Sequence, residues 1–585
     1  MSTFKPLDGM RKKLHSTTGA YEGVVDQNGD TAFPAAALSA TDVAGAQALM
    51  SRAGNPPEFY GAIGDGSADD GAALQAWATA GGPVLTLPKA KTYKCRNLRL
   101  SSGQTLRLNG STLLFGGTNG TAPVSENVHT IAYAEGASGA RLSDIAVIGP
   151  GRLVGTRSGN DYTSTGAGEQ DTLSFQYVDG VTVSGVTFED TKQDCVSLDE
   201  VTAVVVERNR FLRSGDVAVD VRVGSSIVVR DNYAETVRSL VSCKPNNTGV
   251  TITGNTALTF GVGITAHGAG WRIANNRILT TTTPDGNNGA NSSGIEVYET
   301  GGAQTGVTWA GMSIVGNVIA GRSNASGIYL RDSPNSTWTD VVINGNVIDA
   351  IRGVLVESGT RVTVSGNSIN AGTSGGVVSN NAQVARLAIT GNVIQATGTS
   401  GSGIIDTVTP GVVISGNSLS TTTAGVIGIR TTSAAIRAKI SSNEVRTGTG
   451  VAILVNGPGS AIIGNECVTT AAAAINAAGA SCVVSANALA PVGGEGVLIS
   501  AARVTVSGNT VTSGTHGVRV GPSGSGASAS NAVVSGNTVT GCQFFGVNVT
   551  SGCVDAIVTN NNLVGNTSGG ITDAGTTTTA ANNKP

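Results

Sequence analysis

Apolar and polar residues alternate with a period of two over most of the chain, in short segments that end in glycine and asparagine. TITGN at 251–255, TVSGN at 363–367 and VVSGN at 533–537 are examples. Such alternation predicts β-strands with one buried face, and the Gly-Asn pairs predict tight turns, because asparagine tolerates the left-handed backbone conformation. A second alternating strand, often led by glycine, follows each turn, as in GIEVYE at 294–299.

This phrase recurs at a regular spacing. Fifteen asparagines end its copies, 21 to 29 residues apart except for one interval of 41. They are Asn209, Asn232, Asn255, Asn276, Asn317, Asn346, Asn367, Asn392, Asn417, Asn443, Asn465, Asn487, Asn509, Asn537 and Asn561. A repeat of this length predicts a solenoid, in which each unit buries its apolar face against its neighbours.

We therefore expect an all-β coil from about residue 96 to about residue 575, with three short strands in each turn. Equivalent strands of successive turns should run parallel, ~4.8 Å apart. The stacked asparagine amides should bond from coil to coil. The long interval contains TTTTPDGNNGANSSG at 280–294, which predicts a loop insertion.

The chain before the repeats has a different pattern. Residues 1–55 lack the phrase, and we interpret them as a separate N-terminal attachment segment. Residues 56–120 should form a cap and the first coils. Within them, AALQAWATA predicts a helix that stops at Gly81, followed by a strand at PVLTLP. Such a helix would cover the open end of a solenoid, where backbone groups otherwise remain unpaired.

Composition and charge narrow the possibilities. Glycine is frequent (83 residues) and aromatic residues make up 4%, so small and β-branched side chains must fill the core. A net charge of −3 without a basic run argues against nucleic-acid binding. No stretch of apolar residues is long enough to cross a membrane, and MSTFKPLDGMRKKLH lacks the apolar core of a secretory signal.

Cysteine usage points to a reducing compartment. The seven cysteines are odd in number and scattered, and none shows metal-binding spacing, so we expect buried free thiols and no bound metal. Acidic residues are unevenly placed, because only 6 of the 39 follow residue 359. A C-terminal half made largely of Ala, Val, Gly, Ser and Thr is poorly solvated, which predicts that it packs against copies of itself.

On the outward side of the Gly-led strands, some side chains differ from the repeat pattern. Counting from each asparagine, one such residue per coil falls in a common column. The column is Asp199, Asp220, Lys244, His267, Glu296 and Tyr329, with Asp216, Arg222, Arg238, Tyr298 and Arg331 beside it. Equivalent positions further along are mostly small or uncharged. Polar outward residues are also what any solvated sheet presents, so the column is a hypothesis of function.

The repeat resembles the right-handed parallel β-helix of pectate lyases and polygalacturonases, which carry an asparagine ladder. GAIGDGSADDGAALQAW resembles the N-terminal cap of pectate-lyase-like chains, a form frequent in bacteriophage tailspikes. The resemblance covers about residues 57 to 575. It implies a right-handed single-stranded parallel β-helix with an N-terminal capping helix, assembled as a trimer. It also implies a saccharide groove within residues 121–360 and a β-helix stalk over 361–585.

That groove implies cleavage of glycosidic bonds. Hydrolysis needs one protonated carboxyl and a second carboxylate that attacks or activates water. Asp199 with Asp220, or either with Asp216, is the preferred catalytic pair, and His267 would tune or orient it. The substrate-binding candidates are Arg222, Arg238, Lys244, Glu296, Tyr298, Tyr329 and Arg331. Polygalacturonases carry a D-D pair and a G-H-G motif. QDC at 193–195 and AHG at 266–268 match these only in part, which argues against pectin as substrate.

Other chemistries and roles stay open. β-Elimination from a uronate could use Lys244, His267 or Arg238 as base, with acids holding Ca²⁺; hydrolysis needs no cofactor. The leading hypothesis is a homotrimeric spike on a virion surface, attached to the particle through residues 1–55, that binds and cleaves host surface polysaccharide. The alternatives are a non-catalytic receptor-binding or structural spike, and a free-standing lyase, hydrolase or epimerase.

Overall fold

The computed structural model describes most of the chain. The described residues are 11–14, 21–25, 31–34, 55–117, 129–157, 171–244, 246–280, 293–298, 307–332, 336–381, 383–399, 401–521 and 529–585. Within the predicted attachment segment these comprise only three short strands. They are β1 (Arg11–Leu14), β2 (Tyr21–Val25) and β3 (Thr31–Pro34), which pair antiparallel. The division of the chain at residues 55, 120 and 360 stays a prediction.

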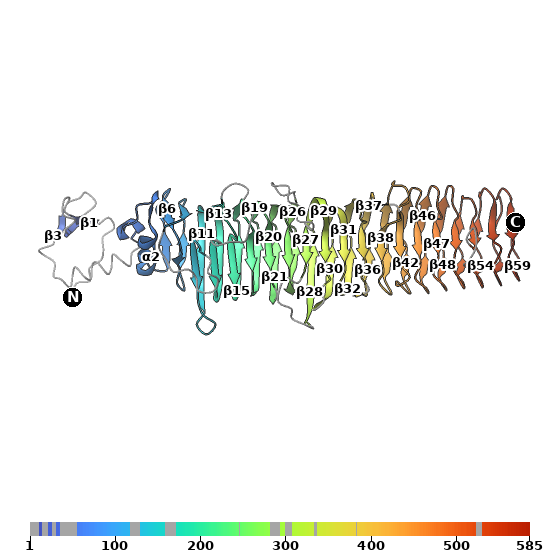
Figure 1. The fold of residues 1–585 in the computed structure, drawn as a ribbon, viewed down its shortest axis with the longest axis horizontal. Helices are drawn as coiled ribbons and strands as arrows, with labels where there is room; N and C mark the ends of the chain where they lie inside the picture. Colours follow the sequence, from blue (N-terminus) through green and yellow to red (C-terminus); the bar gives the residue numbers. More distant parts are fainter. Residues whose placement is uncertain are drawn as a thin grey trace.

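The described residues between 55 and 585 form a parallel β-solenoid of about 19 turns, as the sequence predicted (Figure 1). One turn consists of β42 (Lys439–Ser441), β43 (Glu444–Thr447) and β44 (Ile453–Val455). Each strand pairs in parallel with its equivalent in the next turn, so that Lys439 lies beside Ala461 of β45 (Ala461–Ile463). All described pairings between named strands of this sheet are parallel, which makes the chain a rod of stacked coils.

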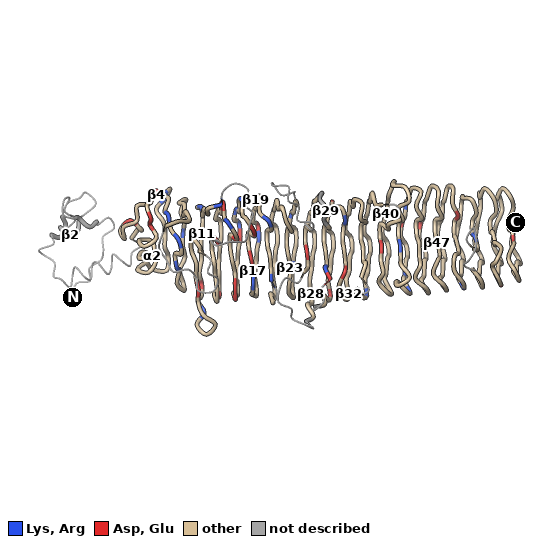
Figure 2. Tube along the Cα trace, viewed as in Figure 1, with Lys and Arg blue, Asp and Glu red and all other residues tan. Residues whose placement is uncertain are grey.

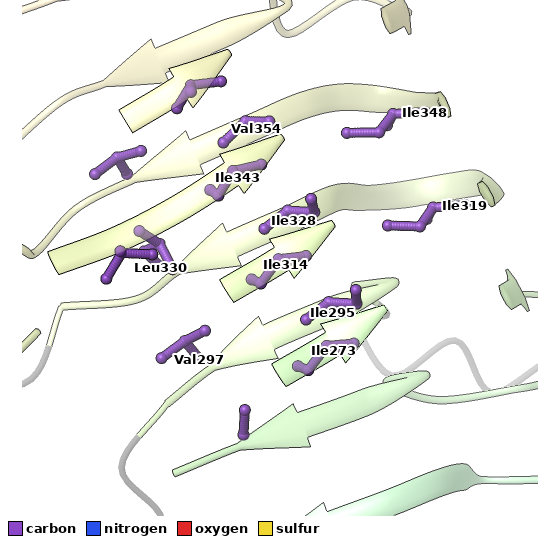
Figure 3. Packing of buried hydrophobic residues seen from close by; sticks show 14 of the residues in the cluster. Ile273, Ile295, Val297, Ile314, Ile319, Ile328, Leu330, Ile343, Ile348 and Val354 are labelled. Carbon is purple, nitrogen blue, oxygen red and sulfur yellow. The ribbon is translucent and has the colours of Figure 1, made fainter. Parts of the chain in front are cut away.

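The core consists of columns of like side chains. Ile273, Ile314 and Ile343 follow one another in register, and Ile295, Ile328 and Val354 do the same on a second wall (Figure 3). All six are fully buried. Burying each such side chain contributes about 1.5–3 kcal/mol. β-Branched residues suit this arrangement because their restricted χ1 angles repeat from coil to coil without clashing.

The asparagine ladder is present as predicted. Asn392 Nδ2 donates to Asn417 Oδ1 at 2.9 Å, and its own Oδ1 accepts from the backbone N of Asn367 at 3.0 Å. All fifteen repeat asparagines take part, and the ladder continues one rung further to Asn583. The long sequence interval does not interrupt it, since Asn276 donates directly to Asn317 Oδ1 at 3.0 Å. Residues 281–292 of the predicted insertion lie outside the described residues.

The predicted helix before the coils is also present, as α2 (Gly71–Ala80), and it ends before Gly81, whose backbone is extended. Leu74 and Trp77 are buried, and Trp77 Nε1 donates to the carbonyl of Asn55 at 2.8 Å. The strand expected at PVLTLP is β5 (Val84–Thr86). That α2 protects the open end of the solenoid stays a prediction.

All seven cysteines are buried and unbridged, as expected, whereas the reducing compartment stays a prediction. Burial raises the pKa of the Cys195 thiol to about 12, which removes its nucleophilic thiolate at neutral pH. Among the described helices, none has the length and apolar character needed to cross a bilayer.

Candidate functional site

The Gly-led strands form one wall of the solenoid. Those that hold the predicted site are β12 (Leu173–Gln176), β14 (Val196–Asp199), β17 (Val217–Val221), β20 (Ser239–Cys243), β23 (Ile264–Ala266), β27 (Ile295–Val297) and the end of β29 (Val318–Leu330). Their register places the predicted residues in two rows. The first row is Ser197, Asp220, Ser242, Thr265, Glu296 and Tyr329.

The second row lies two residues further along the chain, at or just past the end of each strand, and comprises Asp199, Arg222, Lys244, His267, Tyr298 and Arg331. The prediction of a single column is therefore wrong, because it mixed the two rows. Counting from the asparagines failed because the loop between each asparagine and the following strand varies in length. The first row lies 10 residues after Asn232, at Ser242, but 20 residues after Asn276, at Glu296. Asp220, Glu296 and Tyr329 do share a row, whereas Asp199 and Lys244 lie beside it.

Asp220 is the most strongly perturbed outward carboxyl. It is 3% exposed, and Arg222 Nε donates to its Oδ2 at 3.2 Å while Lys244 Nζ lies 3.7 Å from the same oxygen. Burial raises the pKa of Asp220 to about 6, Lys244 opposes that shift and the charge of Asp216 adds to it. Asp220 can therefore carry a proton near neutral pH and release it, as a general acid must.

Asp194 was missed as a site residue. It lies just before β14, nearly fully buried, and its Oδ1 accepts from the backbone N of Val217 at 3.2 Å. Asp171 Oδ1 accepts from the backbone N of Asp194 in the same way, so two aspartates form a short ladder. Burial raises the pKa of Asp194 well above its ordinary value, and the charges of Asp220, Asp171 and Asp216 raise it further. We call Asp171, Asp194, Asp216 and Asp220 the acid cluster.

The remaining predicted carboxyls have different partners. Asp216 is paired with Arg238, whose Nη1 donates to its Oδ1 at 3.1 Å, at the rim of the acid cluster. Asp199 accepts from Gln176 Nε2 at 2.9 Å, one coil earlier in its own row. The structure therefore brings Asp216 and Asp220 together with Arg222, Arg238 and Lys244, and places Asp199 at the side.

The other predicted binding residues form a second group, which we call the tyrosine–arginine cluster: Glu296, Tyr298, Tyr329, Arg331 and Glu357. Arg331 Nη1 donates to Glu296 Oε1 at 3.1 Å, and its guanidinium stacks 4.0 Å from the ring centre of Tyr298. Tyr329 donates to Glu357 Oε2 at 2.5 Å. Glu357 was missed because it comes directly after the apolar segment Val354–Val356, in the coil that follows Tyr329.

These contacts change what the two tyrosines can do. Arg331 covers one face of Tyr298, so only the opposite face remains for a sugar ring. Burial raises the pKa of Glu296, and Arg331 opposes the shift. The cluster lies three coils from Asp220 in the same row, about 14 Å along the rod at one strand spacing per coil.

The predicted outward placement of His267 is wrong. The residue is 1% exposed, and its ring meets the edges of Trp309 and Trp338 with centroids 5.6 Å away in each case. The strand β23 ends at Ala266, before the histidine, so alternation along the strand no longer sets its direction, and the two tryptophans cover its ring. His267 therefore packs inside the coil. Trp271, four residues further along the chain, is also buried.

Metal ligands are not gathered in the part of the chain that the structure describes. No group of three or more His, Cys, Asp or Glu side chains is arranged there to hold an ion. One family model, described as periplasmic copper-binding protein (NosD), matches residues 285–445, and the described residues of that span offer no copper ligand set.

Several solved structures have related folds at low identity. PfbA, a surface adhesin of Streptococcus pneumoniae, is 15% identical with a TM-score of 0.46, covering 66% of this chain and 92% of its own. A family 28 exopolygalacturonase of Yersinia enterocolitica is 13% identical (TM-score 0.43; 63% and 77% covered). Tailspike protein 3 of bacteriophage CBA120 is 12% identical (TM-score 0.36; 72% and 65% covered).

These likenesses are too weak to assign an activity, and no curated protein sequence matches the chain. The family itself is shown by sequence. The model described as right handed beta helix region matches residues 129–278 and 424–584, more than half of the chain. The parallel coils, the asparagine ladder and this match agree, and the chain belongs to the right-handed β-helix family.

Proposed function

We propose that the protein binds a surface polysaccharide along the wall of Gly-led strands and hydrolyses it at the acid cluster. One observation carries the proposal. Asp220 is an outward carboxyl whose pKa is raised to about 6, with a second carboxyl, Asp216, close enough to influence it. A pair of carboxyls held in different protonation states is what glycoside hydrolysis requires.

In this proposal Asp220 donates its proton to the glycosidic oxygen as the C–O bond breaks. Asp216 is the preferred second carboxylate, which takes a proton from water as the water oxygen bonds to the anomeric carbon. Asp199 remains the alternative second carboxylate. Arg222, Arg238 and Lys244 would hold anionic groups of the polymer. The buried Asp194 acts as a positioning residue, because its side chain accepts from the backbone of β17.

Asp220→Asn tests the assignment. With capsular polysaccharides and lipopolysaccharides of candidate hosts as substrates, the variant should release fewer new reducing ends by at least a hundredfold, the usual contribution of a general acid. Asp406→Asn is the matched control, because Asp406 occupies the same row further along and pairs with Arg430. Unchanged cleavage by Asp220→Asn would remove the acid cluster from the mechanism.

The pH dependence gives a second readout of the same proposal. If Asp220 is the acid, the wild-type rate falls as pH rises through about 6, where the group loses its proton. Asp216→Asn and Asp199→Asn, made separately, identify the second carboxylate. The variant that lacks the second carboxylate should lose activity, and azide or formate should restore it, because a small nucleophile can replace the missing carboxylate.

β-Elimination is the second candidate chemistry. Three cations, Arg222, Arg238 and Lys244, contact Asp220 or Asp216, where they could neutralise the carboxylate of a uronate. Ultraviolet absorbance of an unsaturated uronate in the products, in place of saturated products, identifies this reaction. A protein that binds the polymer and yields neither product is a receptor-binding or structural spike.

We propose further that three copies assemble into a spike on a virion, attached through residues 1–55. The support is the C-terminal half, which has few charges (Figure 2) and exposes large apolar side chains such as Val393 (60%), Val492 (60%) and Phe544 (48%). Such surface is commonly covered by another subunit. Sedimentation at low concentration should give three times the chain mass, whereas a monomer favours a free-standing enzyme.

A further inference from the structure

A distinct row of residues lies at the corner that precedes each V-S-G-N strand. Ala388 of β36 (Ala388–Thr390), Val413 of β39 (Val413–Ser415), Lys439, Ala461 and Val483 of β48 (Val483–Ser485) are in register, followed by Thr505 of β51 (Thr505–Ser507). Two residues before each lies a corner residue with positive φ. These are Arg386, Gly411, Arg437, Gly459, Ser481 and Arg503.

Arginine adopts a strained backbone conformation at this corner. Glycine occupies it at 411 and 459, where the left-handed conformation involves no side-chain clash. Arg386, Arg437 and Arg503 adopt φ values of 53°, 55° and 57°, which cost about 1 kcal/mol each relative to glycine. Serine and asparagine also occupy this corner, at 481 and 531, so what distinguishes the three arginines is their charge. We call these three residues the arginine edge.

Other arginines of the C-terminal half are paired with carboxylates. Arg430 pairs with Asp406, Arg446 with Glu444, and Arg519 with Glu495. Within the described residues, the arginine edge has no such pair, and Arg503 Nε donates only to the hydroxyl of Ser481 at 3.2 Å.

Another arginine at the same corner position is paired with a carboxylate. Arg361 also has a positive φ there, and it is paired with Asp340 at 2.5 Å, one coil earlier. From residue 386 to residue 531 no corner residue is acidic, and Lys439 adds a fourth positive charge next to Arg437. All four of these cations are exposed.

The spacing of the charges indicates the ligand. Arg386 and Arg437 are two coils apart and Arg437 and Arg503 are three coils apart, which gives ~10 Å and ~14 Å at one strand spacing per coil. A linear polysaccharide with one carboxylate on every second sugar carries charge at a comparable spacing. Nucleic acid carries a much denser charge, which a line of isolated arginines would match poorly.

We propose that the arginine edge is a second binding surface, which holds a linear acidic polysaccharide along the rod axis. It lies on the corner before the V-S-G-N strands, whereas the acid cluster lies on the Gly-led strands, so it does not depend on catalysis. A second copy of the chain is a poorer partner. The acidic residues of the C-terminal half are few, and Asp406, Glu444, Glu466 and Glu495 already pair with arginines.

The test uses the full chain with Arg386, Arg437 and Arg503 all changed to glycine. Glycine suits the left-handed conformation, so the variant should melt at or above the wild-type temperature. Binding of a hyaluronan oligosaccharide, measured at low salt by titration calorimetry, should weaken about tenfold, as expected for the loss of three exposed charge contacts. The wild-type affinity should fall as salt increases.

The matched control is Arg361→Gly combined with Asp340→Asn, which removes a paired arginine from the same corner and should leave binding unchanged. Neutral dextran of the same length should not bind at the edge. Equal hyaluronan binding by wild type and the triple variant would overturn the proposal. So would tighter arginine-dependent binding of a single-stranded oligonucleotide, or a triple variant that loses the native oligomeric mass, because the edge would then serve another partner.

Discussion

At the scale of single residues, burial decides which carboxyls can do chemistry. Asp220 has a folded-state pKa raised from 3.8 to about 6, so its protonated form is favoured by folding. Its contribution to stability is complete below its unfolded pKa and is lost as pH rises through about 6. The shift corresponds to about 3 kcal/mol at full ionisation.

Asp220→Asn should reveal this cost. The difference in free energy of unfolding, variant minus wild type, should increase by about 3 kcal/mol between about pH 3 and about pH 8, because asparagine does not ionise. Denaturant unfolding of both proteins across this pH range measures the difference. If the free energies of unfolding of the two proteins changed in parallel with pH, the pKa of Asp220 would not be shifted by folding. Asp406→Asn is again the comparison, since its carboxyl is paired and more exposed.

Residue chemistry was only partly predictable from the sequence. Asp220 could be found because it interrupts an alternating strand with a charge. Asp194 could not be found in this way, because it precedes its strand, at a position that neighbouring coils bury. Alternation predicted an outward His267, but two tryptophans from later coils cover its ring. In each failure, residues distant in the chain determine the environment.

At the scale of elements, each asparagine rung supports two coils. Asn392→Ala removes the acceptor for the backbone N and Nδ2 of Asn367, which would leave two buried donors without their partner. The expected loss is about 3 kcal/mol, confined to the adjoining coils. Hydrogen exchange should show faster exchange over residues 343–417 and little change near residue 537. Asn370→Ala, on the exposed side of the same coil, should have little effect.

The helix α2 allows a second test of an element. Trp77→Ala leaves a cavity beneath the helix and removes the donor to the Asn55 carbonyl, for an expected loss of about 3–5 kcal/mol. If α2 protects the end of the solenoid, the first coils should exchange faster while the C-terminal coils stay protected. Uniform exchange along the rod would argue against that role. Phe59→Ala, at an exposed position, provides the comparison.

Elements were more predictable than the register between their side chains. The turns carry local chemistry, Gly-Asn after an alternating strand, so strand order and the ladder followed from the sequence. Register across the Gly-led strands depends on loops of unequal length. The local sequence does not show how many residues each loop contains. The two rows of the site therefore emerged only from the paired strands.

At the scale of the whole molecule, one sheet runs continuously from β4 (Asp65–Asp69) to β59 (Thr579–Ala581). We expect a chain that starts at Asn55 to keep the melting temperature and the number of subunits of the full protein, because it retains every strand of this sheet and the partner of Trp77. Calorimetry and sedimentation measure both. Fewer subunits would mean that residues 1–54 contribute to assembly.

The ladder makes length an adjustable property of the rod. Every rung uses the same donors and acceptors, so a coil is defined by its neighbours and not by its place in the chain. Deleting residues 466–487 would join Asn465 to Ala488, which normally follows the next rung, and would leave an unbroken series of amides. Whole coils can thus be gained or lost between the acid cluster and the C-terminus, changing how far the protein reaches without disturbing either end.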